Sequence, residues 1–201
     1  MTTTPRSLLL AASAIVLALT ASGCSGDDST NSAATSPPAA AETGAEASLD
    51  ELAALGAHDL IATLEATPVA QRRADLRASV QPDHVLLSSG SEEIAVPIPD
   101  GEHYLSIAPY VSTTHDCYFH SLTTCTGELG GERVTVRVVD DETGEVYVDE
   151  SGELHDNGFI GVWLPSGRTA TVTVTSDDGT GSVTVSTGDE DLTCLTELQL
   201  A

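Results

Sequence analysis

Cysteine and histidine are concentrated in one short stretch of this sequence. His115, Cys117, His120 and Cys125 lie within the eleven residues HDCYFHSLTTC, and Cys194 lies near the C-terminus. Thiolates favour Cu(I) and Zn²⁺, and imidazole accepts zinc or either oxidation state of copper, whereas Ca²⁺ and Mg²⁺ need oxygen ligands. These five residues therefore predict a site for copper or zinc.

The spacing of the cysteines is also compatible with a disulfide or a structural metal. It matches neither the C-x2-C of a zinc finger nor the C-x-x-C of a thioredoxin. In an oxidising compartment, Cys117 and Cys125 can form a disulfide across a hairpin, or either can pair with Cys194 and leave one free thiol. Three cysteines and one histidine can also hold a structural Zn²⁺. We expect Tyr118 and Phe119 to belong to the core or to a hydrophobic shell around the site.

The other histidines and the acidic residues do not indicate an ordinary active site. His58 and His84 are expected to face solvent or lie in loops, and His103 and His155 are more distant alternatives for a ligand. The sequence contains no G-x-S-x-G, no H-E-x-x-H and no Walker loop, so hydrolase and transferase activities are not expected. Any activity would at most be reduction of Cu(II) by the cysteine thiols.

Length and charge restrict the class of protein further. The chain has 201 residues, 40% of them hydrophobic, which suits one domain with a modest core and excludes a large multidomain enzyme. Its formal charge is −24, and its seven basic residues are all Arg. We therefore expect no nucleic-acid partner and no binding to an anionic membrane surface.

The N-terminal part has the pattern of an export signal. Residues 1–23 carry Arg6 and an apolar run of about a dozen residues, which is too short to span a membrane. Small residues precede Cys24, as in the lipobox of bacterial lipoproteins, so we expect Cys24 to be lipidated. Residues 24–47 have the composition of a disordered tether. The prediction is an exported lipoprotein that faces the extracytoplasmic side and meets the membrane through its lipid anchor only.

The fold class predicted for the rest is α+β, mainly β. Residues 48–90 are expected to form a helical segment, with a capping box at Ser48 and a second helix from Thr67-Pro68 through Leu76 towards Val80. Residues 91–201 should form an antiparallel, β-sandwich-like metal-binding domain, because their apolar residues alternate with period two. The expected strands are 94–98, 104–111, 134–138, 145–148, 159–164, 169–175 and 182–186.

Several stretches of the sequence resemble the CueP family of periplasmic copper-binding proteins. They are HDCYFHSLTTCTGEL, NGFIGVWLP, TATVTV, TCLTELQL and the helical stretch TPVAQRRADLRASVQPDHVLLS. The resemblance covers about residues 48–201 and implies copper binding through Cys117, Cys125 and Cys194. It also implies conversion of Cu(II) to Cu(I) and transfer to a client such as a copper/zinc superoxide dismutase. The lipobox and the acidic tether depart from the simple periplasmic signal of that family.

These observations lead to one main hypothesis and two alternatives. The main hypothesis is a membrane-tethered protein of copper homeostasis that holds Cu(I) through its three cysteines, with His115 or His120 as a first ligand for Cu(II). A thiol–disulfide reductant would return oxidised cysteines to thiols. The alternatives are a disulfide-stapled interaction domain and a structural Cys/His zinc site, each on a lipid anchor.

Overall fold

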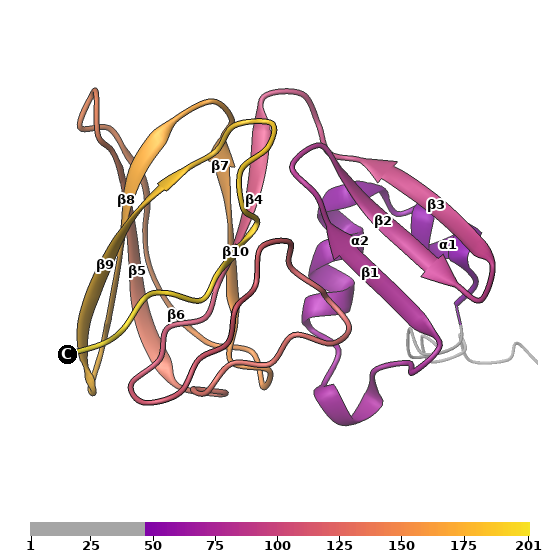
Figure 1. Ribbon diagram of the computed structural model, residues 1–201, viewed down its shortest axis with the longest axis horizontal. Helices are drawn as coiled ribbons and strands as arrows, with labels where there is room; N and C mark the ends of the chain where they lie inside the picture. Colours follow the sequence, from indigo (N-terminus) through magenta and orange to yellow (C-terminus); the bar gives the residue numbers. More distant parts are fainter. Residues whose placement is uncertain (1–46) are drawn as a thin grey trace, which may run out of the picture. The chain divides into compact units, whose positions relative to one another are not determined.

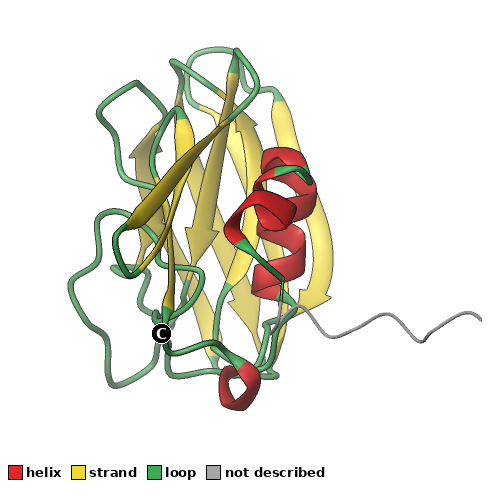
Figure 2. Cartoon of the chain, turned by 90° about the vertical axis from the view of Figure 1, so that its right-hand side faces the viewer, coloured by secondary structure: helices red, strands yellow, loops and turns green. Residues whose placement is uncertain are grey.

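The computed structural model describes residues 47–201. The predicted signal peptide, the lipidation site Cys24 and the tether up to residue 46 lie outside the described residues. Within the described part, no helix is long and apolar enough to cross a membrane. The secondary structure is mostly strand with a small helical part, which confirms the predicted fold class (Figure 2).

The helical part consists of two short helices, α1 (Leu49–Ala53) and α2 (Gly56–Glu65). The predicted capping box is present: the Ser48 hydroxyl accepts a hydrogen bond from the Glu51 amide, and the Glu51 carboxylate accepts one from the Ser48 amide. The helices do not run on as one because Gly56, the first residue of α2, has a φ of 74°, which is outside the right-handed helical region.

The prediction of a second helix after Thr67-Pro68 is wrong. A single 3-10 turn, η1 (Val69–Gln71), is followed by strand β1 (Leu76–Val80). Leu76, Ala78 and Val80 are buried in alternation, so a period of two governs this stretch. The helical interpretation of residues 48–90 therefore holds only as far as the end of α2.

The strands of this region form a small antiparallel sheet. Its order is β1, β2 (His84–Ser89) and β3 (Glu92–Pro97), so the expected boundary at residue 90 falls inside the sheet. Helices α1 and α2 lie against this sheet and share a core with it (Figure 1). Tyr104 and Trp163, from two strands of the second half, pack on the same core.

The second half contains all of the other strands that were predicted, with shifted ends. They are β4 (Glu102–Ile107), β5 (Arg133–Asp140), β6 (Val146–Glu153), β7 (Ile160–Pro165), β8 (Thr169–Ser176) and β9 (Gly179–Ser186). One sheet has the antiparallel order β6-β5-β8-β9, and a second has the order β10-β4-β7. The Val and Leu side chains of both sheets enter one core, as in a sandwich.

In the second half, the strand that the sequence did not predict is β10 (Cys194–Leu195), just as β1 and β2 were not predicted in the first half. It pairs with β4 in parallel, with Cys194 opposite Ser106, so the sandwich is not purely antiparallel. Two residues are too few to give a periodic signal, and the pairing depends on the backbone of β4. This short strand places Cys194 in the buried interior of the molecule's second half.

Candidate functional site: a cluster of cysteine and histidine

The long loop between β4 and β5 carries four of the five residues predicted for the site. Part of this loop is fixed on the edge of β1, because the Val80 amide donates to the His120 carbonyl at 2.8 Å and the Leu122 amide donates to the Ala78 carbonyl at 2.9 Å. The amide of Cys194 donates to the Tyr118 carbonyl at 3.1 Å. Backbone contacts therefore join three distant parts of the sequence at one place.

The three sulfur atoms lie together. Cys117 and Cys194 form a disulfide with their Cα atoms 5.7 Å apart, which is one of the pairings that the sequence left open. Cys125 is a free thiol, and its Sγ lies 3.5 Å from the Sγ of Cys117. The described form is therefore one disulfide plus one thiol, and a site with three thiolates requires reduction of the disulfide.

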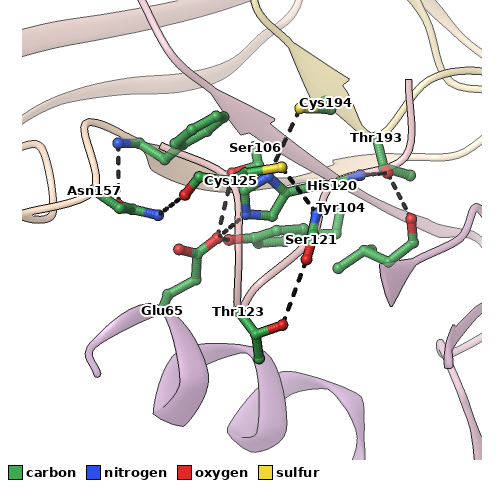
Figure 3. Close-up of polar contacts among 12 residues, drawn as sticks. Glu65, Tyr104, Ser106, His120, Ser121, Thr123, Cys125, Asn157, Thr193 and Cys194 are labelled. Atoms are coloured by element: carbon green, nitrogen blue, oxygen red, sulfur yellow. Dashed lines mark hydrogen bonds and ion pairs between the residues drawn. The ribbon is translucent and has the colours of Figure 1, made fainter. Parts of the chain in front are cut away.

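His120 lies beside the sulfur atoms and is completely buried (Figure 3). Its Nδ1 is 3.7 Å from the Sγ of Cys194, and its Nε2 is 2.9 Å from Oε1 of Glu65. The second contact is a close ion pair whose N–H direction is poorly aligned, since Nε2 makes no hydrogen bond of good geometry. Because Glu65 occupies the Nε2 side, Nδ1 is the nitrogen that faces the sulfurs.

Glu65 is the last residue of α2 and is only 2% exposed. Its Oε1 accepts hydrogen bonds from the hydroxyls of Tyr104 and Ser106, each at 3.3 Å. Gly161 leaves the space that the Tyr104 hydroxyl fills, since a Cβ at that position would overlap it. Oε1 thus has three partners in a buried site, whereas Oε2 has no hydrogen-bond partner among the described residues.

Burial and charge act in opposite directions on the three ionisable groups here. Burial raises the pKa of Glu65, but its contact with His120 and the charge of that ring outweigh the burial and lower it. Burial lowers the pKa of His120, but contacts with Cys125 and Glu65 raise it overall. Burial raises the pKa of the Cys125 thiol, but the nearby ring of His120 and its charge outweigh the burial and lower it. Each of the three shifts favours the charged form of its group.

An apolar group and a tight backbone contact support the cluster. Phe159 is fully buried and packs with Ala108 and the cysteines. The amide of Gly127 donates to the Asn157 carbonyl at 2.6 Å, and Gly158, at φ 79°, approaches Gly127 so closely that a Cβ would lie 2.8 Å from its carbonyl carbon. The segment before β7 therefore fixes the backbone next to Cys125.

The site opens to solvent through a surface pocket of about 630 Å³. Its lining consists of Thr113, Thr114, His115, Thr124, Cys125, Thr126, Gly127 and Glu128. His115 is exposed, while its ring contacts the edge of Phe159. A solute can therefore approach Cys125 from the His115 side without displacing the core.

Two groups of side chains have the geometry to hold a metal ion. They are His115 with Cys117 and Cys125, and His120 with Cys125 and Cys194; within each group the ligand atoms lie within 4.8 Å of one another. Sulfur and imidazole suit Cu(I) or Zn²⁺, and the short distances between them suit a single ion.

All five residues predicted for the site are in this cluster. In the part of the chain that the structure describes, the remaining histidines are not in either group. His103 is buried and its Nε2 contacts the Leu192 carbonyl, whereas His58 stacks on Trp163. Tyr118 and Phe119 were expected in the core or in a hydrophobic shell around the site. They are 53% and 38% exposed, so they are not part of the core, and Phe159 takes that place.

Sequence reasoning missed Glu65, Tyr104 and Asn157. For Glu65 a signal existed, since it lies four residues after the buried Ile61 on α2, and a carboxylate on an apolar helix face needs a partner. The roles of Tyr104 and Asn157 had no such signal, because they depend on contacts between distant segments.

Comparison with known proteins identifies a protein family and a solved structure that are similar to this chain. The family described as periplasmic copper-binding protein CueP matches residues 59–199. Among solved structures, "Crystal Structure of S.CueP" has 37% sequence identity and a TM-score of 0.66, and the match covers 71% of this chain and 86% of that chain. The comparison with curated proteins finds no match.

Proposed function

Since the chain belongs to the CueP family of periplasmic copper-binding proteins, we propose that it holds Cu(I) outside the cytoplasm through Cys117, Cys125 and Cys194. The observation that carries the proposal is the position of the free Cys125 thiol, 3.5 Å from a sulfur of a disulfide that joins residues 77 positions apart. No single sequence segment brings these sulfurs together, and three thiolates with an adjacent imidazole are a donor set for Cu(I).

The disulfide suggests how Cu(II) is converted. Thiolates of Cys117 and Cys194 each give one electron, so two Cu(II) become two Cu(I) as one S–S bond forms. The Cys117–Cys194 disulfide of the described form is the bond that this step would create. To regain three thiols, the protein needs two electrons and two protons from a dithiol reductant. Without it the reduction is stoichiometric, so we do not class the protein as an enzyme.

His120 is the proposed first ligand for Cu(II), with His115 as the alternative. Imidazole binds both oxidation states, whereas thiolates prefer Cu(I). We further propose that the protein is anchored through lipidated Cys24 and passes copper to a client such as a copper/zinc superoxide dismutase. Exposed Tyr118 and Phe119, next to Cys117, offer a surface for such a contact.

Two other functions are each supported by one feature of the site. The Cys117–Cys194 disulfide fits a stapled interaction domain. Three sulfurs and one imidazole also fit a four-coordinate structural Zn²⁺. A stapled domain keeps the disulfide after mild reduction and retains no copper, whereas a structural zinc protein loses its fold when a chelator removes the metal.

A competition titration tests the proposal. The protein is reduced, and a chromophoric Cu(I) chelator competes for copper with the wild type and with Cys117→Ser, Cys125→Ser and Cys194→Ser. We expect one retained Cu(I) in the wild type and loss of affinity in each variant, with His84→Ala, in β2, as a control away from the cluster. Wild-type affinity in all three cysteine variants would eliminate the thiolate site.

A further inference from the structure

The two groups of ligands at the site overlap in one residue. The outer set is His115, Cys117 and Cys125, and the inner set is His120, Cys125 and Cys194. Cys125 belongs to both, and its Sγ lies 3.5 Å from the Sγ of Cys117. One ion can therefore pass from one set to the other while it stays bound to Cys125.

The two imidazoles differ in exposure. His115 is exposed and lines the 630 Å³ pocket with Cys125, whereas His120 is 0% exposed. Both rings contact Phe159, with ring centroids at 6.4 Å for His115 and 4.6 Å for His120. The same buried phenyl ring thus lies beside an accessible ligand and an inaccessible one.

The two rings also differ in how firmly they are held. The Nε2 of His120 lies 2.9 Å from the Glu65 carboxylate, and its backbone amide donates to the Thr193 hydroxyl at 3.0 Å. Among the described residues, the ring of His115 has no hydrogen-bond partner. A fixed ligand lowers the cost of ordering the bound state, while an exposed one is accessible for exchange.

We propose that the site has two positions for copper, an outer one for exchange and an inner one for retention. This inference rests on the proposed function and applies to the reduced protein. Cu(I) binds first to His115 with the thiolates of Cys117 and Cys125. It then exchanges His115 for His120 and gains the thiolate of Cys194, while Cys117 and Cys125 stay bound. One Cu–N bond breaks as another forms, one Cu–S bond is added, and no electron is transferred.

The two histidines should therefore have different effects on rates and on affinity. In His115→Ala, Cu(I) uptake and Cu(I) transfer to a competing chelator should both slow by about tenfold, while the equilibrium affinity stays within about threefold. Removal of a ligand that the metal contacts only during uptake and release lowers both rates together and leaves their ratio, the equilibrium affinity, unchanged. In His120→Ala, the affinity should fall by about tenfold or more, since a ligand of the held state is lost.

The experiment combines stopped-flow transfer with the equilibrium titration on reduced wild type, His115→Ala, His120→Ala and the control His84→Ala. A second readout uses histidine-labelled ¹⁵N protein and one equivalent of Ag(I), a redox-inert analogue of Cu(I). We expect the metal to change the ¹⁵N chemical shifts of the His120 ring nitrogens. The chemical shifts of the His115 ring nitrogens should remain as in the metal-free protein.

The outcomes separate this inference from the proposed function. Equal losses of affinity in His115→Ala and His120→Ala would show one site with both ligands and overturn the two positions. Unchanged transfer rates in His115→Ala would also overturn them. If the wild type retains no Cu(I) and the cysteine variants match it, the proposed function fails and the two positions fail with it.

Discussion

Glu65 brings a carboxylate into the cluster from the end of α2, and this changes what His120 can do. Its Oε1 lies 2.9 Å from Nε2 of the imidazole, with both side chains buried. The contact turns Nδ1 towards the sulfur of Cys194. A metal ligand whose other nitrogen contacts a carboxylate is held in one orientation, so a helix outside the loop positions a residue within it.

Replacement of Glu65 by Gln tests this role. We expect the free energy of unfolding of the reduced, metal-free protein to fall by about 3 kcal/mol, because the buried imidazolium loses its counter-charge. Urea unfolding followed by circular dichroism measures the loss. Asp59→Asn, on the exposed face of the same helix, is the control. A loss no larger than that of the control would show that the pair does not stabilise the fold.

At the scale of elements, Thr193 joins the two halves of the described chain. Its hydroxyl donates to the Val80 carbonyl at 2.7 Å and accepts from the His120 amide at 3.0 Å. Its backbone precedes Cys194 and pairs with β4. The N-terminal sheet, the site loop and β10 are therefore connected through one buried side chain.

In Thr193→Val, which keeps the shape but removes both hydrogen bonds, we expect a loss of about 1–3 kcal/mol in the free energy of unfolding. Cu(I) affinity of the reduced protein should fall as well, since Cys194 is no longer held in place. Thr193→Ser, which retains the hydroxyl, should restore most of both. If the valine variant matches the wild type in denaturant and in the titration, the connection has no energetic role.

The turn after β5 gives a prediction about pH. The Asp140 carboxylate accepts hydrogen bonds from the Tyr147 hydroxyl and from the amides of Thr143 and Glu142, which together lower its pKa to about 2. A lowered pKa stabilises the fold above the unfolded-state value of about 3.9, and the contribution disappears as the pH falls towards 2.

Asp140→Asn should therefore lower the midpoint of thermal unfolding at pH 7, and the difference from the wild type should shrink between pH 4 and about 2. Asp141→Asn is the control, because its carboxylate accepts one hydrogen bond, from the Thr171 hydroxyl. A difference that stays constant from pH 7 to pH 2 would contradict the assignment.

Strong periodicity determines which elements could be predicted. Val134, Val136 and Val138 alternate with polar residues, and the expected strand is β5. At Leu76–Val80 the alternation covers only five residues, and the Thr67-Pro68 pattern before it predicts a helix. The two residues of β10 carry no pattern at all. The residue types of the site were predictable, whereas the Cys117–Cys194 pairing depends on long-range contacts and stayed one of several possibilities.

For the molecule as a whole, the disulfide links the loop after β4 to the last strand. It closes a segment of 77 residues, and in the chain-entropy account such a link contributes about 4 kcal/mol to stability. We therefore expect the metal-free protein to unfold at a lower denaturant concentration after reduction. Cu(I) should restore part of the loss, because the folded state brings the three thiolates together and binds the metal more tightly than the unfolded chain does.

Denaturant unfolding with and without a reductant measures this difference. Cys125→Ser is the control, because it keeps the disulfide and should show the same loss on reduction. Identical midpoints for the oxidised and reduced wild type would mean that the disulfide does not restrict the unfolded chain.

The most direct test of the central claim is X-ray absorption at the copper edge, measured on the reduced protein with one equivalent of Cu(I). Coordination by Cys117, Cys125 and Cys194 predicts a first shell dominated by sulfur, with an imidazole contribution from His120. A shell of nitrogen and oxygen alone would contradict the account, because the sulfur cluster would then not be where copper binds.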